Sequence, residues 1–287
     1  MLAPVRRRPL TAFFVIAYLG SWILWSPWWL SQSGVGLLPF ELPLSAVAGI
    51  NQLGLFAGPF ASALVVTRVT EGRDGLKQLF RRMVQWRARP FWYFLALVLI
   101  PAVTGIGYLV LPGTTLVLED GAFAVLGLLA TTYLIYLLGG PVQEEPGWRG
   151  FALPRLQARL RPVMAAVVLG LIHCFWHAPL FLTAEWDTAR HEPSQFLAYL
   201  VLIVSMSIVM SWLFNGSGGS VLLAILGHNS VNWALFATAA LTGRTVESNW
   251  PAALGLAVLA IVTIAATKGR LGYRPLPTIS GQEARGR

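Results

Sequence analysis

Apolar residues are grouped into long runs along most of the chain, and short polar connections separate these runs. Each run has about 20 residues, the length that an α-helix needs to cross the hydrocarbon core of a bilayer. The pattern therefore predicts an all-α fold, a polytopic transmembrane bundle of about eight spans. The runs lie near residues 10–30, 44–66, 91–111, 121–143, 163–182, 196–214, 219–241 and 250–267.

The chain is expected to form one domain, a transmembrane bundle over residues 1–267, followed by a short basic tail at 268–287. Arg6, Arg7 and Arg8 precede the first run, as in a signal peptide. That run is too long for the apolar region of a signal peptide, and no cleavage site of small residues follows it. It is therefore expected to be retained as a span. The tail is rich in Pro, Gly and Arg, which is typical of disorder.

The composition agrees with a bilayer environment. Of the 287 residues, 56% are apolar and only 11% are charged, whereas soluble domains carry about 25% charged residues. A soluble fold could not cover its surface with so few charges. Cys174 is the only cysteine, so no internal disulfide can form.

Membrane topology explains the net charge of +9. All but two of the 21 Lys and Arg residues fall in alternate connections and in the termini, the exceptions being Arg190 and Arg244. Because cytoplasmic loops collect Lys and Arg, both termini are expected in the cytoplasm (N-in, C-in). The basic residues form no single stripe, so nucleic acid is not expected as a partner. The predicted cytoplasmic segments are 1–9, 67–90, 144–162, 215–218 and 268–287.

A first polar cluster, Glu144-Glu145-Pro146-Gly147-Trp148-Arg149, closes the fourth run. Pro146 disfavours helical geometry at Glu145, so the helix is expected to end there. Two adjacent carboxylates repel each other, so one should hold a proton more readily and could act as a general base. Arg149 could keep the other carboxylate ionised. The alternative is a solvated loop that merely begins with acidic residues.

Two further clusters lie inside predicted spans. His173 and His177 are four residues apart in the fifth run, as are His228 and Asn232 in the seventh, so each pair shares a helix face. Ionisable groups at membrane depth are costly and suggest function, although polar contacts between helices are a simpler explanation. Together, the clusters could supply a base, proton carriers and oxyanion donors. No Ser or Cys nucleophile stands beside a histidine, which favours attack by activated water.

The three clusters resemble the motifs of the CAAX protease and bacteriocin-processing (CPBP) family. The first family motif, Glu-Glu-x-x-x-Arg, is matched by Glu144, Glu145 and Arg149, within the run EEPGWRGFALPRLQ. The third, His-x-x-x-Asn, is matched by His228 and Asn232, after the run SWLFNGSGGSVLLAILGH. The resemblance covers about 120–241, the motif-bearing core of the bundle.

The second family motif has an aromatic residue four positions before a histidine. Here His177 supplies the histidine, and Trp176 is a typical neighbour, but His173 stands where the aromatic residue is usual. This departure bears on substrate fit more than on chemistry. We expect His173 to pack, and Trp176 and Arg149 to bind substrate or support the structure.

The resemblance implies an intramembrane endopeptidase of the glutamate type, with a bacterial member's architecture. In this interpretation Glu144 deprotonates water and His177 orients it or shares its proton. His228 and Asn232 form the oxyanion hole, and Glu145 pairs with Arg149. The expected partners are the lipid bilayer and a peptide or membrane-protein substrate, with or without a lipid anchor. The expected location is the bacterial cytoplasmic membrane, with the active site toward the cytoplasmic side.

Three alternatives stay open at this stage. No cofactor is expected, but zinc could bind Glu144, His177 and His228 and leave one position open. A non-catalytic binding protein, such as an immunity factor or chaperone, could keep the same fold. A transporter could line a midplane path with these polar residues, although the absence of an internal repeat counts against it.

Overall fold

The computed structural model describes residues 3–110, 114–115, 121–184, 186, 192–243 and 246–274. Within these residues every regular element is helical, and eight segments are long and apolar enough to cross a membrane. The all-α bundle predicted from the apolar runs is therefore confirmed. Arg190, Arg244 and the tail beyond residue 274 lie outside the described residues. The eight segments are Pro9–Trp29, Leu44–Met83, Pro90–Leu109, Phe123–Gln157, Pro162–Leu182, Pro193–Gly216, Val221–Thr242 and Trp250–Thr267.

Several of these segments are built from more than one helical element. Those labelled η1 to η3 are π-helical turns and η4 is a 3₁₀ turn. The elements are α1 (Ala3–Arg7), α2 (Pro9–Trp29), α3 (Leu44–Leu55), η1 (Phe56–Phe60), α4 (Ala61–Met83), α5 (Pro90–Phe94), η2 (Leu95–Leu99), α6 (Ile100–Leu109), α7 (Ala122–Leu137), α8 (Pro141–Glu145), η3 (Pro146–Ala152), α9 (Leu153–Gln157), α10 (Pro162–Trp176), η4 (Ala178–Leu182), α11 (Pro193–Gly216), α12 (Val221–Thr242) and α13 (Trp250–Thr267).

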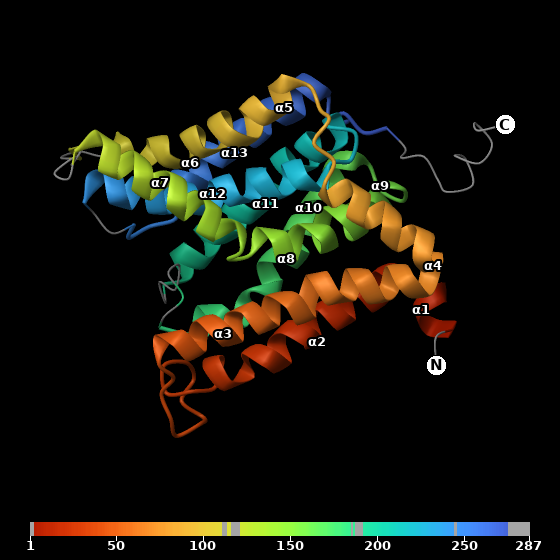
Figure 1. Cartoon of the computed structure of the whole chain (residues 1–287), viewed down its shortest axis with the longest axis horizontal. Helices are drawn as coiled ribbons and strands as arrows, with labels where there is room; N and C mark the ends of the chain where they lie inside the picture. The colour runs from red at the N-terminus through yellow and green to blue at the C-terminus, as the bar shows by residue number, and fades with distance from the viewer. Residues whose placement is uncertain are drawn as a thin grey trace.

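The helices form two groups that run side by side (Figure 1). One group contains α2, α3 and α4, and the other contains α6, α7, α11, α12 and α13. The elements α8, η3 and α10 lie between the groups. Two apolar cores follow this division, and α10 contributes to both, with Leu169 and Trp176 in one and Ala166 and Cys174 in the other. Two of the three polar clusters are thus carried by the elements between the groups, and the third, with His228 and Asn232, lies on α12.

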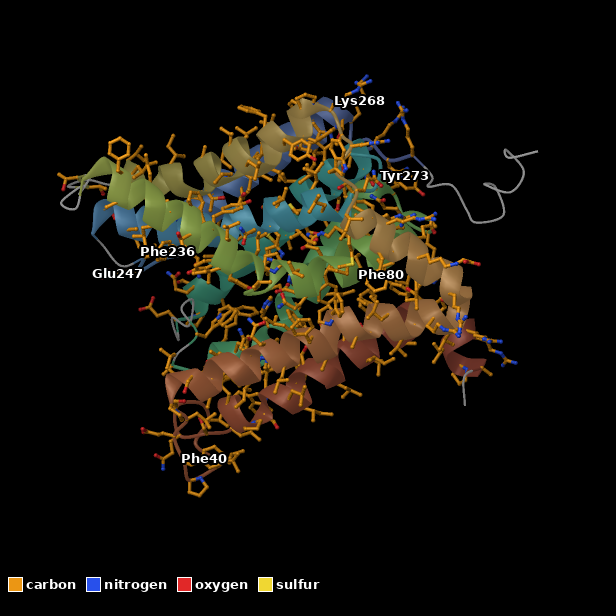
Figure 2. The ribbon with its side chains drawn as sticks, in the orientation of Figure 1. Phe40, Phe80, Phe236, Glu247, Lys268 and Tyr273 are labelled. Atoms are coloured by element: carbon orange, nitrogen blue, oxygen red, sulfur yellow. The ribbon has the colours of Figure 1, made fainter. Side chains whose placement is uncertain are left out.

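The N-terminal helix α1 and the C-terminal end of α13 lie at one end of the bundle (Figure 1), which we call the terminal end. Lys268 and Tyr273 lie toward that end, whereas Phe40 and Glu247 lie toward the opposite end, which we call the far end (Figure 2). The predicted even number of spans requires this arrangement. The bundle's outer surface is apolar, as in α2, where the exposed fractions of Leu19 and Ile23 are 53% and 63%. Lipid is the solvent that suits such a surface.

The second span extends beyond its predicted end at residue 66, as far as Met83. Gly72 interrupts α4 with φ of 72°, a left-handed conformation that glycine adopts readily. The chain bends sharply there, so residues 73–83 fold back over the terminal end (Figure 1). Leu79 of this piece is buried against η3, where Gly150 has no room for a Cβ atom beside the Leu79 side chain. The basic piece therefore caps the bundle.

The prediction that the fourth helix ends near Glu145 is wrong. The break comes earlier, at Gly140, and helical structure continues from Pro141 through Pro146 to Gln157. Pro146 begins the π-helical turn η3, whose altered hydrogen-bond register accommodates a residue without an N–H group. The Glu144–Arg149 cluster is therefore a buried helical segment and not a solvated loop.

The orientation predicts how single cysteines will be labelled. In a Cys174→Ala background, Lys77→Cys at the terminal end should react with a membrane-impermeant maleimide only after intact cells are permeabilised. Glu41→Cys at the far end should react without permeabilisation. Both native side chains are exposed, and the charge bias places the terminal end inside. The reverse labelling pattern would contradict N-in, C-in topology.

Candidate active site

Close packing fixes the segment that carries the two acidic residues. Gly147 lies so near η1 that a Cβ atom would be 2.6 Å from the Pro59 carbonyl oxygen. A Cβ atom on Gly140 would be 2.9 Å from Oε1 of Glu144. Small residues at both positions let α8 and η3 lie against their neighbours and leave room for the first carboxylate.

Glu144 is buried and faces α10. Its Oε2 lies 2.7 Å from Nε2 of His173 and accepts a second hydrogen bond of 3.3 Å from the Trp148 indole N–H. The rings of Trp148 and His173 also pack together, with centroids 5.0 Å apart. His173 therefore does more than pack, in contrast to the sequence-based expectation, because it is a direct partner of the Glu144 carboxylate.

Glu145 is fully buried and faces a different set of partners. Its Oε1 accepts a hydrogen bond of 2.7 Å from Nη1 of Arg149, which is also fully buried. The same oxygen lies 2.7 Å from Nδ1 of His228 in α12. The expected pairing of Glu145 with Arg149 is confirmed, and the contact with His228 was not anticipated.

The two carboxylates are adjacent in sequence but serve separate sites. Successive residues in an α-helix point about 100° apart, since 3.6 residues complete one turn. Glu144 consequently meets α10, and Glu145 meets Arg149 and α12. The sequence suggested that the two negative charges compete directly, but the structure gives each carboxylate its own buried hydrogen-bond network.

His177 lies at the point where α10 gives way to η4. Its Nδ1 is 3.2 Å from the carbonyl oxygen of His173, a contact that requires an N–H at Nδ1, so in the neutral imidazole Nε2 carries the lone pair. The ring is enclosed by the aromatic rings of Trp25, Trp176, Trp186 and Tyr199. This enclosure holds the imidazole in one orientation.

One cavity of about 150 Å³ brings the predicted residues together. Glu144, His173, His177, His228 and Asn232 all line it. The other predicted residues, Glu145, Arg149 and Trp176, are not among the lining residues and lie behind this wall. The cavity is also lined by Asn51, Leu55, Tyr136, Gly139, Leu180, Trp186, Tyr199, Leu202, Ile203, Val231, Leu235 and Asn249.

Some of these lining residues escaped the sequence-based prediction. Asn51 stands in an apolar run, where the sequence alone suggests a polar contact between helices, and Trp186 and Asn249 stand in connections between spans. A polar residue in a connection gives no signal by itself, because connections are normally polar. Only the folded arrangement places Asn249, which precedes α13, beside the motif residues.

The candidate metal ligands differ from the expected set. Donor atoms of Glu144, His173 and His177 lie within 4.8 Å of one another, and all three residues are buried. Among the described residues this is the group that could hold a metal ion. The zinc alternative had included His228, whose Nδ1 instead contacts Glu145. Two imidazoles and one carboxylate are ligands that suit zinc.

The chain is similar to known proteins over the segment that carries these residues. Residues 126–234 match the family model described as type II CAAX prenyl endopeptidase Rce1-like, a range that contains every motif residue named above. The chain is also 29% identical over 102 residues to CAAX prenyl protease 2 of Methanococcus maripaludis. That match covers 34% of this chain and 38% of the relative. The resemblance to the CPBP family is thereby confirmed.

The buried ion pair leads to a stability prediction. Arg149→Met should destabilise the fold by about 3–5 kcal/mol, because Glu145 would keep a buried charge without its cation. Thermal unfolding of the purified protein in lipid would measure the change. The double variant Arg149→Met with Glu145→Gln serves as the control and should recover part of the loss. A loss below about 1 kcal/mol, as for an exposed pair, would contradict this account.

Proposed function

We propose that this protein is an intramembrane endopeptidase of the CAAX-protease type, which hydrolyses a peptide bond with water activated by Glu144. One observation carries the proposal. A carboxylate, three imidazoles and an amide, contributed by three separate spans, line the same small cavity inside an apolar bundle. Such a convergence of ionisable groups is costly at membrane depth and suits acid–base chemistry.

Glu144 is the general base in this proposal. Its Oε2 is engaged by His173 and Trp148, which leaves Oε1, beside Gly140, to accept a proton from water. His177 presents its Nε2 lone pair to the cavity and orients that water. The cleaved amide then receives the proton from Glu144 as it leaves, so the carboxylate alternates between base and acid.

His228 and Asn232 stabilise the negative charge that develops on the substrate carbonyl oxygen. When doubly protonated, His228 donates from Nδ1 to Glu145 and presents Nε2–H to the cavity. Asn232 lies one turn further along α12 and offers its amide N–H groups to the same oxygen. Loss of one such donor costs about 2.7–4 kcal/mol in studied enzymes.

Glu145 and Arg149 act as positioning residues. The carboxylate holds the His228 ring through Nδ1, and Arg149 compensates the carboxylate charge in the buried site. Glu145 is thus the second hydrogen-bond partner of a functional histidine, and it fixes the tautomer and the orientation of that ring. Trp176 packs between Trp25 and Trp148 and supports the His177 ring.

The substrate is a peptide or membrane protein, with or without a lipid anchor, and the protein resides in the bacterial cytoplasmic membrane with both termini inside. The reaction needs no resident cofactor in this mechanism. Zinc, if bound by Glu144, His173 and His177, would supply an acidified water at the same place. The following experiments distinguish these routes from each other and from a binding protein without turnover.

Glu144→Gln should abolish cleavage without unfolding the protein. The amide keeps the size of the side chain and accepts hydrogen bonds but removes the base, so cleavage should fall by at least about 10²-fold. The measurement is release of a quenched reporter peptide by protein in liposomes, with thermal unfolding recorded alongside. Glu145→Gln should lower the unfolding temperature more clearly than it lowers turnover. The exposed Glu247→Gln variant is the matched control and should remain fully active.

Full activity in a folded Glu144→Gln protein would end the glutamate-base mechanism. If wild type and variant both lack turnover yet bind the same membrane partner, the binding-protein alternative is favoured instead.

His173→Phe should lower turnover by about tenfold to a hundredfold, the equivalent of one hydrogen bond to a charged group. The phenyl ring preserves packing against Trp148 but cannot contact the Glu144 carboxylate. Zinc content and activity after chelation should be measured on the same samples. We expect activity to survive chelation. Stoichiometric zinc in wild type that is lost in His173→Phe would instead assign this residue as a metal ligand, and unchanged turnover would restore the packing role.

A further inference from the structure

The site cavity extends from the motif residues toward the far end of the bundle. Its lining includes Leu180 at the end of the fifth span, Trp186 in the following connection, and Asn249 immediately before α13. These positions all belong to the end that lies away from the chain termini. Glu144 and His228 therefore lie at the inner end of this cavity, and Trp186 and Asn249 lie at its outer end.

The terminal end is closed. All seven residues of η3 are buried, and residues 73–83 cover this turn through Leu79. A separate cavity at the terminal end lies among residues such as Trp86, Trp212 and Tyr273, and it shares no lining residue with the site cavity. A substrate approaching from that end would have to displace the packed core of η3.

Besides Nδ1 of His173, three polar atoms in the wall of the site cavity are buried without a hydrogen-bond partner among the described residues. They are the acceptor Oδ1 of Asn51, the donor Nε1 of Trp186 and the donor Nδ2 of Asn249. The Asn249 side chain is the clearest case of an unpartnered donor, because only 3% of this residue is exposed and its amide does not cap α13. A buried donor or acceptor without a partner is unfavourable, so these groups are suited to a ligand that supplies the missing partners.

An extended peptide supplies these partners. Its main chain offers alternating C=O acceptors and N–H donors, which match two donors and one acceptor in the wall. The rest of this wall is apolar, with Leu180, Leu202 and Leu235, so side chains without charge suit it. The cavity has a volume of about 150 Å³, and the peptide would displace the water that fills it.

We propose that Asn51, Trp186 and Asn249 form a subsite for the main chain of the substrate, which enters from the far end. Because the basic segments lie at the terminal end, entry from the far end is entry from the exterior. The substrate class is thus an uncharged peptide segment presented at the outer side of the membrane, in contrast to the cytoplasmic-facing active site expected from the sequence. This inference rests on the proposed peptidase activity for the subsite, but the direction of entry does not depend on turnover.

The kinetic test compares two Asn→Leu variants with an internally quenched peptide of uncharged residues in liposomes. Asn249→Leu should raise KM on the order of tenfold, the equivalent of one hydrogen bond, with kcat within about twofold of wild type and unchanged thermal unfolding. Asn215→Leu is the matched control, since that amide donates to the Leu271 carbonyl away from the cavity. It should lower the unfolding temperature and leave KM unchanged. An unchanged KM in active Asn249→Leu would overturn the subsite.

The direction of entry is tested without activity. In a Cys174→Ala background, Asn249→Cys should react with a membrane-impermeant maleimide in intact cells, and saturating reporter peptide should slow that reaction. Lys77→Cys is the control and should react only after permeabilisation. Reaction of Asn249→Cys only after permeabilisation, or no reaction from either side, would overturn entry from the exterior. An inactive wild-type protein that still labels as expected would remove the peptidase proposal but keep the path.

Discussion

The fully buried ion pair between Glu145 and Arg149 constrains the centre of this bundle. Two charges removed from water are tolerated only when their geometry and hydrogen bonds compensate the cost of desolvation. His228 supplies part of this compensation, because it contacts the same carboxylate oxygen that Arg149 does. Oε2 of Glu145 and Nε and Nη2 of Arg149 have no hydrogen-bond partner among the described residues. The salt bridge joins two residues four positions apart in one segment. The contact with His228 connects that segment to α12. The orientation of His228 in the cavity depends on it.

The same constraint determines where Glu144 points. Once Glu145 is committed to Arg149 and α12, helical geometry turns the preceding side chain by about 100°, toward α10. His173 and Trp148 complete the shell of the Glu144 carboxylate. Glu145 thus contacts a permanent positive charge as well as a histidine, whereas Glu144 contacts a histidine and an indole N–H but no permanent charge. This difference in environment is a physical reason for assigning the base to Glu144.

The spans could be predicted from the sequence because apolar length and charge bias are local properties of the chain. The predicted limits of the eight runs agree with the eight helical segments within a few residues at most ends. The two large differences, at Met83 and Gln157, occur where tertiary packing overrides local signals. Gly72 lets a basic helix fold back onto η3, and a π-helical turn carries the chain past Pro146. Neither effect follows from propensity alone.

The residues of the site could be predicted from the sequence better than the contacts between their side chains. The spacing of the three motifs identified Glu144, His177, His228 and Asn232, and the structure places all four around one cavity. The role of His173 was not predictable, because a histidine where an aromatic residue is usual looks like a packing substitution. Which imidazole meets which carboxylate depends on the rotation of α10 relative to α12. That rotation is set by contacts between distant segments, such as the 2.5 Å hydrogen bond from Tyr18 to the Ile172 carbonyl and the one from Trp22 to the Trp176 carbonyl.

These last contacts also explain the asymmetry of the cavity. They attach α2 to the end of α10, next to His173 and His177. The apolar core that contains α2 therefore closes the site on one side. Toward the terminal end, η3 and the folded-back part of α4 complete the closure. What remains is the direction of Asn51, Trp186 and Asn249, where polar atoms lack partners. The unpartnered atoms of these three residues lie along one wall of the cavity, and they mark the path that we propose for a polar backbone on its way to the base.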